Sequence, residues 1–213
     1  MEDWGSTIEL RPHGIALGAT RGDIAQPSSA AASNVRGMAR VPYLTASDAP
    51  PTVAGTLGKL APLHVFGLVA HAETAFRPWL RFGGALLNDL ALDPKLRELA
   101  ILRVGQLAAR YEWEQHVPIA LRVGVPQEQI DALDRGELDG FDELSRAALE
   151  FVTGVVEGEV DDARYAAIAG QLPDREVVEL ALVAAHYLML ARMMVTFQIE
   201  SDPPAGSAWL LGG

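Results

Sequence analysis

The chain has 213 residues, which suits one domain that buries a hydrophobic core without disulfides or a structural metal. Its 17 lysines and arginines stand against 28 aspartates and glutamates, giving a formal charge of −11, and no dense basic run occurs, so we expect no nucleic-acid partner. Because cysteine is absent, the chain cannot form disulfides or thiolate metal sites and cannot use a cysteine nucleophile.

The two ends of the chain differ in composition from its middle. Residues 1–36 are rich in Gly, Pro, Ser and Ala without a hydrophobic period, so we expect an N-terminal arm that is either poorly ordered or wrapped around a neighbouring subunit. Residues 201–213 carry Pro203-Pro204 and a terminal Gly-Gly and are expected to form a C-terminal tail. The helical domain should therefore cover residues 37–200.

The spacing of apolar residues predicts the helices of this domain. A loop-rich stretch from Pro42 to Pro51 leads into it. Helices are then expected, in chain order, over residues 63–72, 74–90, 94–109, a segment around 111–116 that Gly124 ends, 127–133, 142–156, 161–169 and 174–198. No stretch alternates with a period of two between turn signals, so the predicted fold class is all-α. The last helix is apolar on nearly all sides and is expected to be central to the fold.

Capping residues mark two of these helix starts. Asp93 followed by Pro94 combines an N-cap residue with a proline at the first helical position, so a helix should begin there. Asp174 is expected to cap the long last helix.

Neither an export signal nor a membrane span is predicted. The first three residues (MED) are acidic where a signal peptide is basic, and no apolar segment follows them. The longest apolar run, Leu180 to Ala191, contains His186 and is shorter than the roughly 18 residues that cross a bilayer. We therefore expect a cytoplasmic protein with no membrane partner.

Residues 111–116 read YEWEQH, and Glu112 and His116 are the first candidates for chemistry. Residues four apart on a helix project from one face, close enough to share a proton. The same face continues with Ile119, Ala120 and Val123, which are apolar, so the pair is expected to point toward the core or a pocket. A carboxylate and an imidazole in apolar surroundings have coupled, movable proton affinities, which general acid–base catalysis requires.

Two alternatives remain open for this segment. Glu112 and His116 could instead be a structural hydrogen-bonded pair of the core without a catalytic role. Pro118 cannot donate to the carbonyl of Glu114, so the helix either bends there or restarts with Pro118 in its first turn. A restart would remove the four-residue spacing.

Two further polar residues stand among apolar neighbours. Glu98 is expected to point inward, where a backbone amide, Tyr111 or His116 must satisfy its carboxylate. His186 lies inside the apolar run of the last helix, where a core histidine with one hydrogen bond is the usual explanation. The neighbouring Tyr187 favours the alternative that His186 lines a pocket.

A metal site could be built from Glu112, His116 and either His71 or His186, a mixed set that suits zinc or non-haem iron if the side chains converge. Ligands this scattered along the sequence are a weak signal. We therefore expect neither a metal nor an organic cofactor.

Residues 97–124, RELAILRVGQLAARYEWEQHVPIALRVG, resemble the carboxymuconolactone decarboxylase family of the alkylhydroperoxidase-like superfamily. The likeness extends over about residues 40–200, through the segments PLHVF at 62–66, GGAL at 83–86, LDP at 92–94 and DREVVEL at 174–180. The resemblance implies a compact all-helical subunit that assembles into a dimer, trimer or hexamer.

The peroxidase branch of this superfamily uses a C-x-x-C pair, a histidine that follows it and an upstream glutamate. In this chain Glu98 and His116 are in roughly corresponding places, but Arg110 and Trp113 stand where the cysteines are expected. Peroxide reduction by a thiol cycle is therefore excluded.

The decarboxylase branch lacks that cysteine pair and has an E-x-x-x-H segment, which Glu112 and His116 match. Its reaction, part of the breakdown of aromatic compounds, converts a carboxylated lactone into an enol-lactone with loss of carbon dioxide and needs no cofactor. The resemblance implies a lyase or isomerase in which His116 shuttles the proton, Glu112 is its partner or the acid, and Glu98 is a second carboxylate.

The expected substrate is a small carboxylated lactone or related enolisable acid. A guanidinium group suits a planar carboxylate, which makes Arg103 a candidate to bind it. The other residues expected to contact the substrate are Tyr111, Trp113, His186 and Tyr187.

Two hypotheses from other classes stay open. A non-catalytic binding or assembly module of the same fold predicts that Glu112 and His116 are sealed off with no cavity beside them. A metal-dependent oxygenase or hydrolase that uses these two residues as ligands predicts stoichiometric metal and activity lost to chelators. The cofactor-independent lyase instead predicts turnover in the presence of a chelator.

Overall fold

The computed structural model describes residues 39–203, and within this range the chain is all-helical, without a β-strand. The predicted fold class is therefore confirmed. The helices are α1 (Pro51–Leu57), α2 (His64–Val69), α3 (Glu73–Asn88), α4 (Pro94–Ala108), α5 (Arg110–Arg122), α6 (Gln127–Asp134), α7 (Glu143–Glu157), α8 (Asp162–Ala169) and α9 (Asp174–Phe197). The arm predicted over residues 1–36 lies outside the described residues.

Most predicted helices have bounds within a few residues of the observed ones, and the differences have local causes. Helix α1 follows Pro50-Pro51 and was not predicted, because its seven residues are too few to show a period. Asp93 caps α4 as expected, since its side chain accepts hydrogen bonds from the amides of Lys95 and Leu96. The cap predicted at Asp174 is wrong, because Pro173 is the N-cap residue and Asp174 begins the helix.

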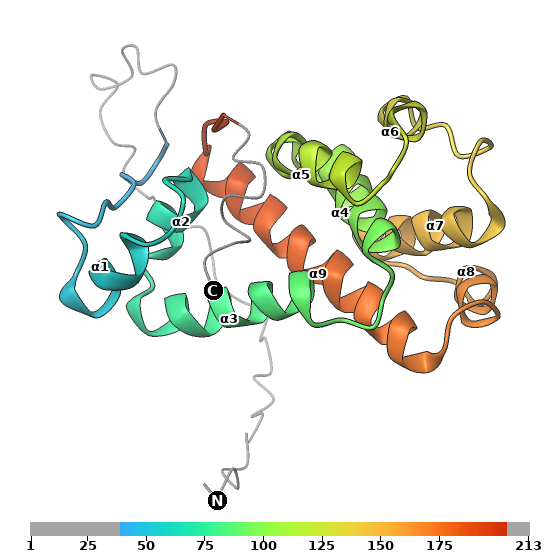
Figure 1. Cartoon of the computed structure of the whole chain (residues 1–213), viewed down its shortest axis with the longest axis horizontal. Helices are drawn as coiled ribbons and strands as arrows, with labels where there is room; N and C mark the ends of the chain where they lie inside the picture. The colour runs from blue at the N-terminus through green and yellow to red at the C-terminus, as the bar shows by residue number, and fades with distance from the viewer. Residues whose placement is uncertain (1–38, 204–213) are drawn as a thin grey trace, which may run out of the picture. The chain divides into compact units, whose positions relative to one another are not determined.

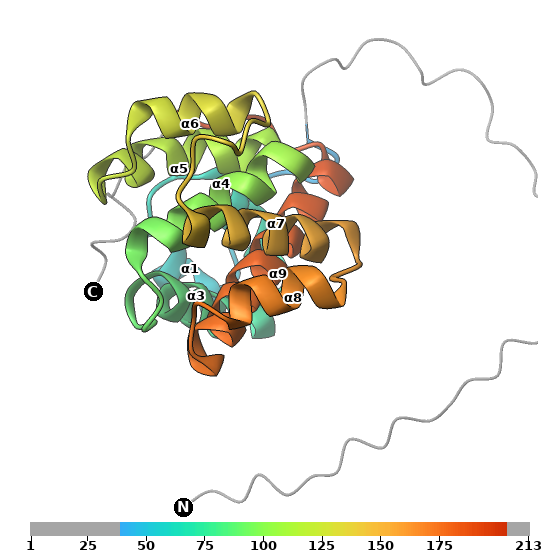
Figure 2. The same cartoon turned by 90° about the vertical axis from the view of Figure 1, so that its right-hand side faces the viewer.

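Helix α4 is the most enclosed element of the domain. It packs against α5, α7 and α9, and the turn of view between Figures 1 and 2 shows it in the middle of this group. Every residue from Leu96 to Gly105 is buried, including the charged Arg97, Glu98 and Arg103. The expectation that the last helix is the central one is thus only partly met, since α9 buries one side and exposes apolar residues on the other.

Two hydrophobic clusters lie on opposite sides of α4. The larger one joins α4 to α1, α2, α3, α7 and α9, and the smaller one joins it to α5, α6 and α7 through residues such as Leu102, Trp113 and Leu149. The crossing of α4 and α5 is close, because a Cβ placed on Gly105 would lie 2.7 Å from the backbone nitrogen of Trp113. Glycine at this position brings the two helices that carry the polar residues of the interior close together.

The two described ends of the domain meet. The amide of Arg40 donates to the carbonyl of Phe197 at 2.8 Å, and the amide of Glu200 donates to the hydroxyl of Tyr43 at 3.2 Å. Asp202 lies in the segment predicted as a tail, yet it is buried and contacts α2 and α5. The chain is therefore packed against the domain at least as far as this residue.

By length and composition, α9 could cross a membrane, and 44% of its apolar window is buried against the rest of the chain. The core helix of a soluble helical protein passes the same test. The apolar character of α9 is explained here by its packing against α4 and α7.

Substituting Gly105→Ala should test the close crossing of α4 and α5. The new methyl group would meet backbone atoms of Trp113 that cannot move independently, so we expect the free energy of unfolding to fall by roughly 1–3 kcal/mol. Urea unfolding followed by circular dichroism measures this change.

The matched control is Gly55→Ala, in the exposed part of α1, where a Cβ meets nothing within 4 Å. This substitution should raise the free energy of unfolding by about 0.5–1 kcal/mol, because alanine loses less conformational freedom in a helix. Equal stability of the two variants would show that the crossing is looser than the structure indicates.

Candidate active site

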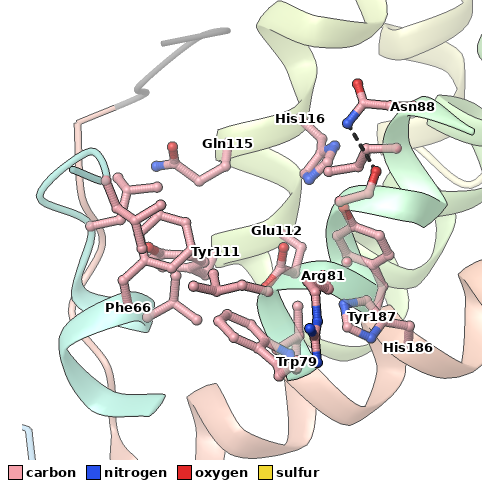
Figure 3. Close-up of a pocket in the computed structure, with 18 of the residues that line it drawn as sticks. Phe66, Trp79, Arg81, Asn88, Tyr111, Glu112, Gln115, His116, His186 and Tyr187 are labelled. Carbon is pink, nitrogen blue, oxygen red and sulfur yellow. Dashed lines mark hydrogen bonds between the residues drawn. The ribbon is translucent and has the colours of Figure 1, made fainter. Parts of the chain in front are cut away.

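Helix α5 places Glu112 and His116 on the wall of one cavity, as Figure 3 shows. Helix α5 is a single helix from Arg110 to Arg122 that includes Pro118. The missing N–H of Pro118 removes only the hydrogen bond to the carbonyl of Glu114, and α5 stays continuous there, so the four-residue spacing of Glu112 and His116 is kept. The restart alternative is therefore excluded. The cavity has a volume of about 770 Å³, which is ample for a small organic molecule.

His116 is held in place by a buried hydrogen bond to Glu98 on α4. Its Nδ1 lies 2.8 Å from Oε2 of Glu98, and neither side chain is more than 2% exposed. The other carboxylate oxygen of Glu98 accepts a hydrogen bond from Nε of Arg97 at 3.1 Å and forms an ion pair with its Nη2 at 3.1 Å. Arg97 also donates from Nη1 to the carbonyl of Leu87 at 2.6 Å. His116 is thus the partner of the Glu98 carboxylate among the three groups considered from the sequence. Arg97 is a second partner.

The charge state of Glu98 determines the tautomer of His116. Burial alone would raise the pKa of Glu98, but the adjacent His116 and Arg97 outweigh it and lower this pKa below its ordinary value. Glu98 is therefore an ionised carboxylate that can only accept a hydrogen bond, so Nδ1 of His116 carries the proton it donates. This arrangement fixes the orientation of the imidazole.

The environment of Glu112 is opposite to that of Glu98. Its side chain is 4% exposed, and its Oε1 has no hydrogen-bond partner among residues 39–203. Burial raises the pKa of Glu112 to about 7, although the nearby His116 acts to lower it. Both the carboxylic acid and the carboxylate are therefore populated near neutral pH, which is the condition for a general acid or base.

Aromatic rings form the wall beside these two residues. The ring of Tyr187, on α9, meets the His116 ring edge-on at a centroid distance of 4.9 Å and the His186 ring at 5.4 Å. Trp79, on α3, lies at 6.5 Å from His186. Apolar residues supply most of the remaining surface: Leu60, Leu63, Val65, Phe66, Leu80, Leu87 and Leu190.

Six of the eight site residues expected from the sequence are gathered at this cavity. Glu112, His116, Tyr111, His186 and Tyr187 line it, and Glu98 lies directly behind His116. These positions come from three different helices, α4, α5 and α9, which only the packing brings together.

The other two expected residues lie elsewhere. Arg103 donates to Thr153 on α7 and to Gln106 on its own helix, at 2.9 and 2.6 Å, and does not line the cavity. Trp113 faces the smaller hydrophobic cluster and stacks with Arg110 at 4.8 Å. Both point away because they lie on other faces of α4 and α5 than Glu98 and Glu112. We therefore leave them out of the site.

Several residues at the cavity were not expected from the sequence. Lys59, Trp79 and Arg81 line it from α3 and from the turn after α1. Asp202 supports one wall from behind, because it accepts a hydrogen bond from Tyr111 at 2.5 Å and its carbonyl accepts one from Gln115 at 3.0 Å. Lys59, Trp79, Arg81 and Asp202 all lie outside the YEWEQH segment. An isolated exposed lysine or arginine cannot be recognised as a site residue from the sequence alone.

No set of three His, Asp or Glu side chains suited to a metal ion occurs within residues 39–203. His71, one of the proposed ligands, instead contacts the carbonyl of Pro42 through Nε2 at 2.8 Å and does not line the cavity. His186 and His116 are separated by the ring of Tyr187. The ligand set considered from the sequence therefore does not assemble.

Comparison with known families and structures agrees with the all-helical fold. The sequence model of the carboxymuconolactone decarboxylase family matches residues 73–154, from the start of α3 into α7. The resemblance inferred from the sequence is confirmed over these residues, and the cysteine-free chain has a fold similar to that of alkylhydroperoxidase-like structures. No curated protein matches the chain.

Solved structures share the fold at low sequence identity. The alkylhydroperoxidase AhpD core of an uncharacterised peroxidase-related protein from Ralstonia eutropha JMP134 has 20% identity and a TM-score of 0.66, over 84% of this chain and 98% of that one. A peroxidase-related protein from Silicibacter sp. TM1040 has 15% identity and a TM-score of 0.60, over 70% and 81%. The debrominase Bmp8, in complex with 2,3,4-tribromopyrrole, has 19% identity and a TM-score of 0.62, over 79% and 94%.

Glu112→Gln should test the environment of this carboxyl group through stability. The pKa of Glu112 is raised from 4.5 to about 7 in the folded chain. The stability that the neutral acid contributes is therefore fully present below the unfolded value and is lost as the pH rises through about 7. Glutamine is neutral at every pH. The variant should become more stable than the native chain by up to about 3 kcal/mol between roughly pH 5 and pH 8.

Urea unfolding at a series of pH values measures this difference. The control is Glu114→Gln, on the same helix but half-exposed and outside the cavity, for which the difference from the native chain should not change with pH. A pH-independent difference for Glu112→Gln would show that this carboxyl group is solvated.

Proposed function

We propose that the protein is a cofactor-independent lyase or isomerase that acts on a small carboxylated lactone or related enolisable acid by proton transfer, as a carboxymuconolactone decarboxylase does. The observation that carries this proposal is the pairing of Glu112 and His116 on the wall of a cavity of about 770 Å³. A binding or assembly module without catalysis requires neither the cavity nor the raised pKa of Glu112. The match of residues 73–154 to the family supports the same choice.

The proposed reaction can be written with the groups present. The bond between the substrate carboxylate and the ring breaks, carbon dioxide leaves, and the electron pair is delocalised onto the conjugated lactone carbonyl as an enolate. The carboxylic acid of Glu112 donates a proton to the carbon that completes the enol-lactone, and a proton from water restores the acid. His116, with Glu98 fixing its tautomer, is placed to pass this proton or to stabilise the enolate oxygen.

The different roles proposed for Glu98 and Glu112 follow from their different environments. Glu98 is ionised and fixed by Arg97, so it acts as a positioning residue for His116 and does not touch the substrate. Glu112 has a raised pKa and an unpaired oxygen beside the cavity, so it is the proton donor. Pairs of titratable groups whose environments push their pKa values apart commonly hold such roles.

Turnover of a carboxylated muconolactone, followed by ultraviolet absorbance and by carbon dioxide release, tests the proposal. We expect His116→Ala and Glu112→Gln each to lower kcat by roughly a hundred- to ten-thousand-fold, because each removes a proton-transfer group. Turnover by the native protein should persist in chelator. Circular dichroism should show that both variants remain helical.

His71→Gln is the matched control, because His71 lies outside the cavity and its loss should leave kcat unchanged. Normal turnover by His116→Ala would overturn the assignment of the proton shuttle. Activity that disappears in chelator would favour the metal-dependent alternative over the lyase.

We also propose that the protein is a cytoplasmic homo-oligomer. Helix α9 supports the oligomer, because Val178, Leu182, Ala185 and Met189 lie on one face of it and are all exposed. An apolar stripe of this kind commonly marks a contact between subunits.

Sedimentation velocity tests the oligomer. The native chain should sediment as more than one copy, and Leu182→Glu should shift it toward the monomer by placing a charge in the apolar contact. Leu121→Glu is the control, since Leu121 is exposed to the same extent, 42%, on α5. A native chain that sediments as a monomer would contradict the proposal.

A further inference from the structure

The segment that follows α9 carries a buried carboxylate, Asp202, which contacts two of the helices around the cavity. Its Oδ2 accepts hydrogen bonds from the backbone amide of His64, the first residue of α2, at 2.7 Å and from the hydroxyl of Tyr111, on α5, at 2.5 Å. Its Oδ1 lies 3.0 Å from Nδ1 of His64. The Asp202 side chain is only 5% exposed, and a buried carboxylate is costly unless donors satisfy it. Asp202 therefore joins α2 to α5 through the donors that it needs itself.

The backbone around Asp202 adds contacts to the same region. The carbonyl of Asp202 accepts from Nε2 of Gln115, on α5, and the carbonyl of Glu200 lies 3.0 Å from Nδ1 of His64. A carbonyl oxygen can only accept, so this Nδ1 carries a proton. The ring of Tyr43 stacks on the His64 ring at a centroid distance of 4.1 Å, and its hydroxyl accepts from the amide of Glu200. We call residues 198–203 the C-terminal strap, which Figure 1 shows in dark red between α2 and α5.

The strap lies behind one end of the cavity. Tyr111 and Gln115 line this end from α5, and Phe66 lines it from α2. Figure 3 draws these three side chains together, at the opposite end from His186. Helix α5 packs against α4 and α9, so Asp202 adds a polar link from α5 to α2.

The two α5 residues that Asp202 contacts stand next to the proposed proton-transfer pair. Tyr111 precedes Glu112, and Gln115 precedes His116. Burial and the hydrogen bond to Asp202 raise the pKa of Tyr111 above its ordinary value, so its hydroxyl keeps the proton that it donates. Anchoring these neighbours restrains the position of α5 relative to a bound substrate. A displacement of about 1 Å at a reacting group can cost a hundredfold in rate.

We propose that Asp202 is a positioning residue for the reaction, which anchors the C-terminal strap across α2 and α5 and thereby fixes the helix that presents Glu112 and His116. This inference rests on the proposed function. Asp202 does not line the cavity, so it acts through Tyr111 and Gln115 and touches no substrate. It also lies outside residues 73–154, the part that matches the family model.

Hydrogen exchange of the full chain, followed by mass spectrometry, tests the anchor without a substrate. Asp202→Ala leaves the His64 amide and the Tyr111 hydroxyl without their acceptor, so peptides that contain residues 63–66 or 198–203 should exchange about tenfold faster than in the native chain. The matched control is Asp142→Ala, because Asp142 accepts from the amide of Ser145 at the start of α7, outside the cavity. This control should leave the exchange of both peptides unchanged.

Turnover of a carboxylated muconolactone tests the positioning role. Asp202→Ala should lower kcat by roughly ten- to a hundredfold and leave KM unchanged, at a temperature where circular dichroism shows it folded. Added formate should restore kcat, because it can fill the space of the lost carboxylate and accept from the same donors. Asp202→Asn fills that space and keeps one acceptor oxygen, so its loss should be smaller and should not respond to formate. Asp142→Ala should keep the native kcat.

The outcomes separate this inference from the proposed function. Unchanged exchange in Asp202→Ala would overturn the anchor. Faster exchange with a native kcat, or a loss of kcat that formate does not restore, would overturn the positioning role and leave the strap a purely structural element. If Asp202→Ala does not fold, a native kcat for Asp202→Asn overturns the positioning role in the same way. Absence of turnover by the native chain would overturn the proposed function and the positioning role together, whereas faster exchange would still support the anchor.

Discussion

The hydrogen bond between His116 and Glu98 joins α5 to α4 inside the domain, and the arrangement of the site depends on it. Both side chains are almost fully buried, and Arg97 satisfies the second carboxylate oxygen of Glu98. Gly105 lets the two helices approach closely enough for this contact. The packing of α4 against α5 therefore sets the position of the His116 imidazole as well as part of the core.

The same buried region holds two glutamates in different protonation states. Glu98 is paired with His116 and Arg97 and has a lowered pKa, whereas Glu112, one turn before His116, has no hydrogen-bond partner for one oxygen and a raised pKa. Desolvation acts on both, and the difference lies in the charge and hydrogen bonds that each receives. In the proposed reaction this division supplies a proton donor, Glu112, and an oriented imidazole, His116.

The cavity links this pair to residues that have no sequence motif. Trp79 and Arg81 come from α3, His186 and Tyr187 from α9, and each lies at a helix position that also suits a core or surface residue. Asp202 reaches the wall from beyond the end of α9 through Tyr111 and Gln115.

The sequence by itself determined the all-helical class, most helix bounds, the Asp93 cap and the four-residue spacing of Glu112 and His116, because these follow from local periodicity and capping. It also indicated Glu98, His186 and Tyr187 as inward-facing residues. Only the tertiary structure decided that His116 satisfies Glu98, that Arg103 and Trp113 face other neighbours, and that Trp79 and Arg81 reach the cavity. Those outcomes depend on how helices far apart in the chain pack together, which local spacing does not encode.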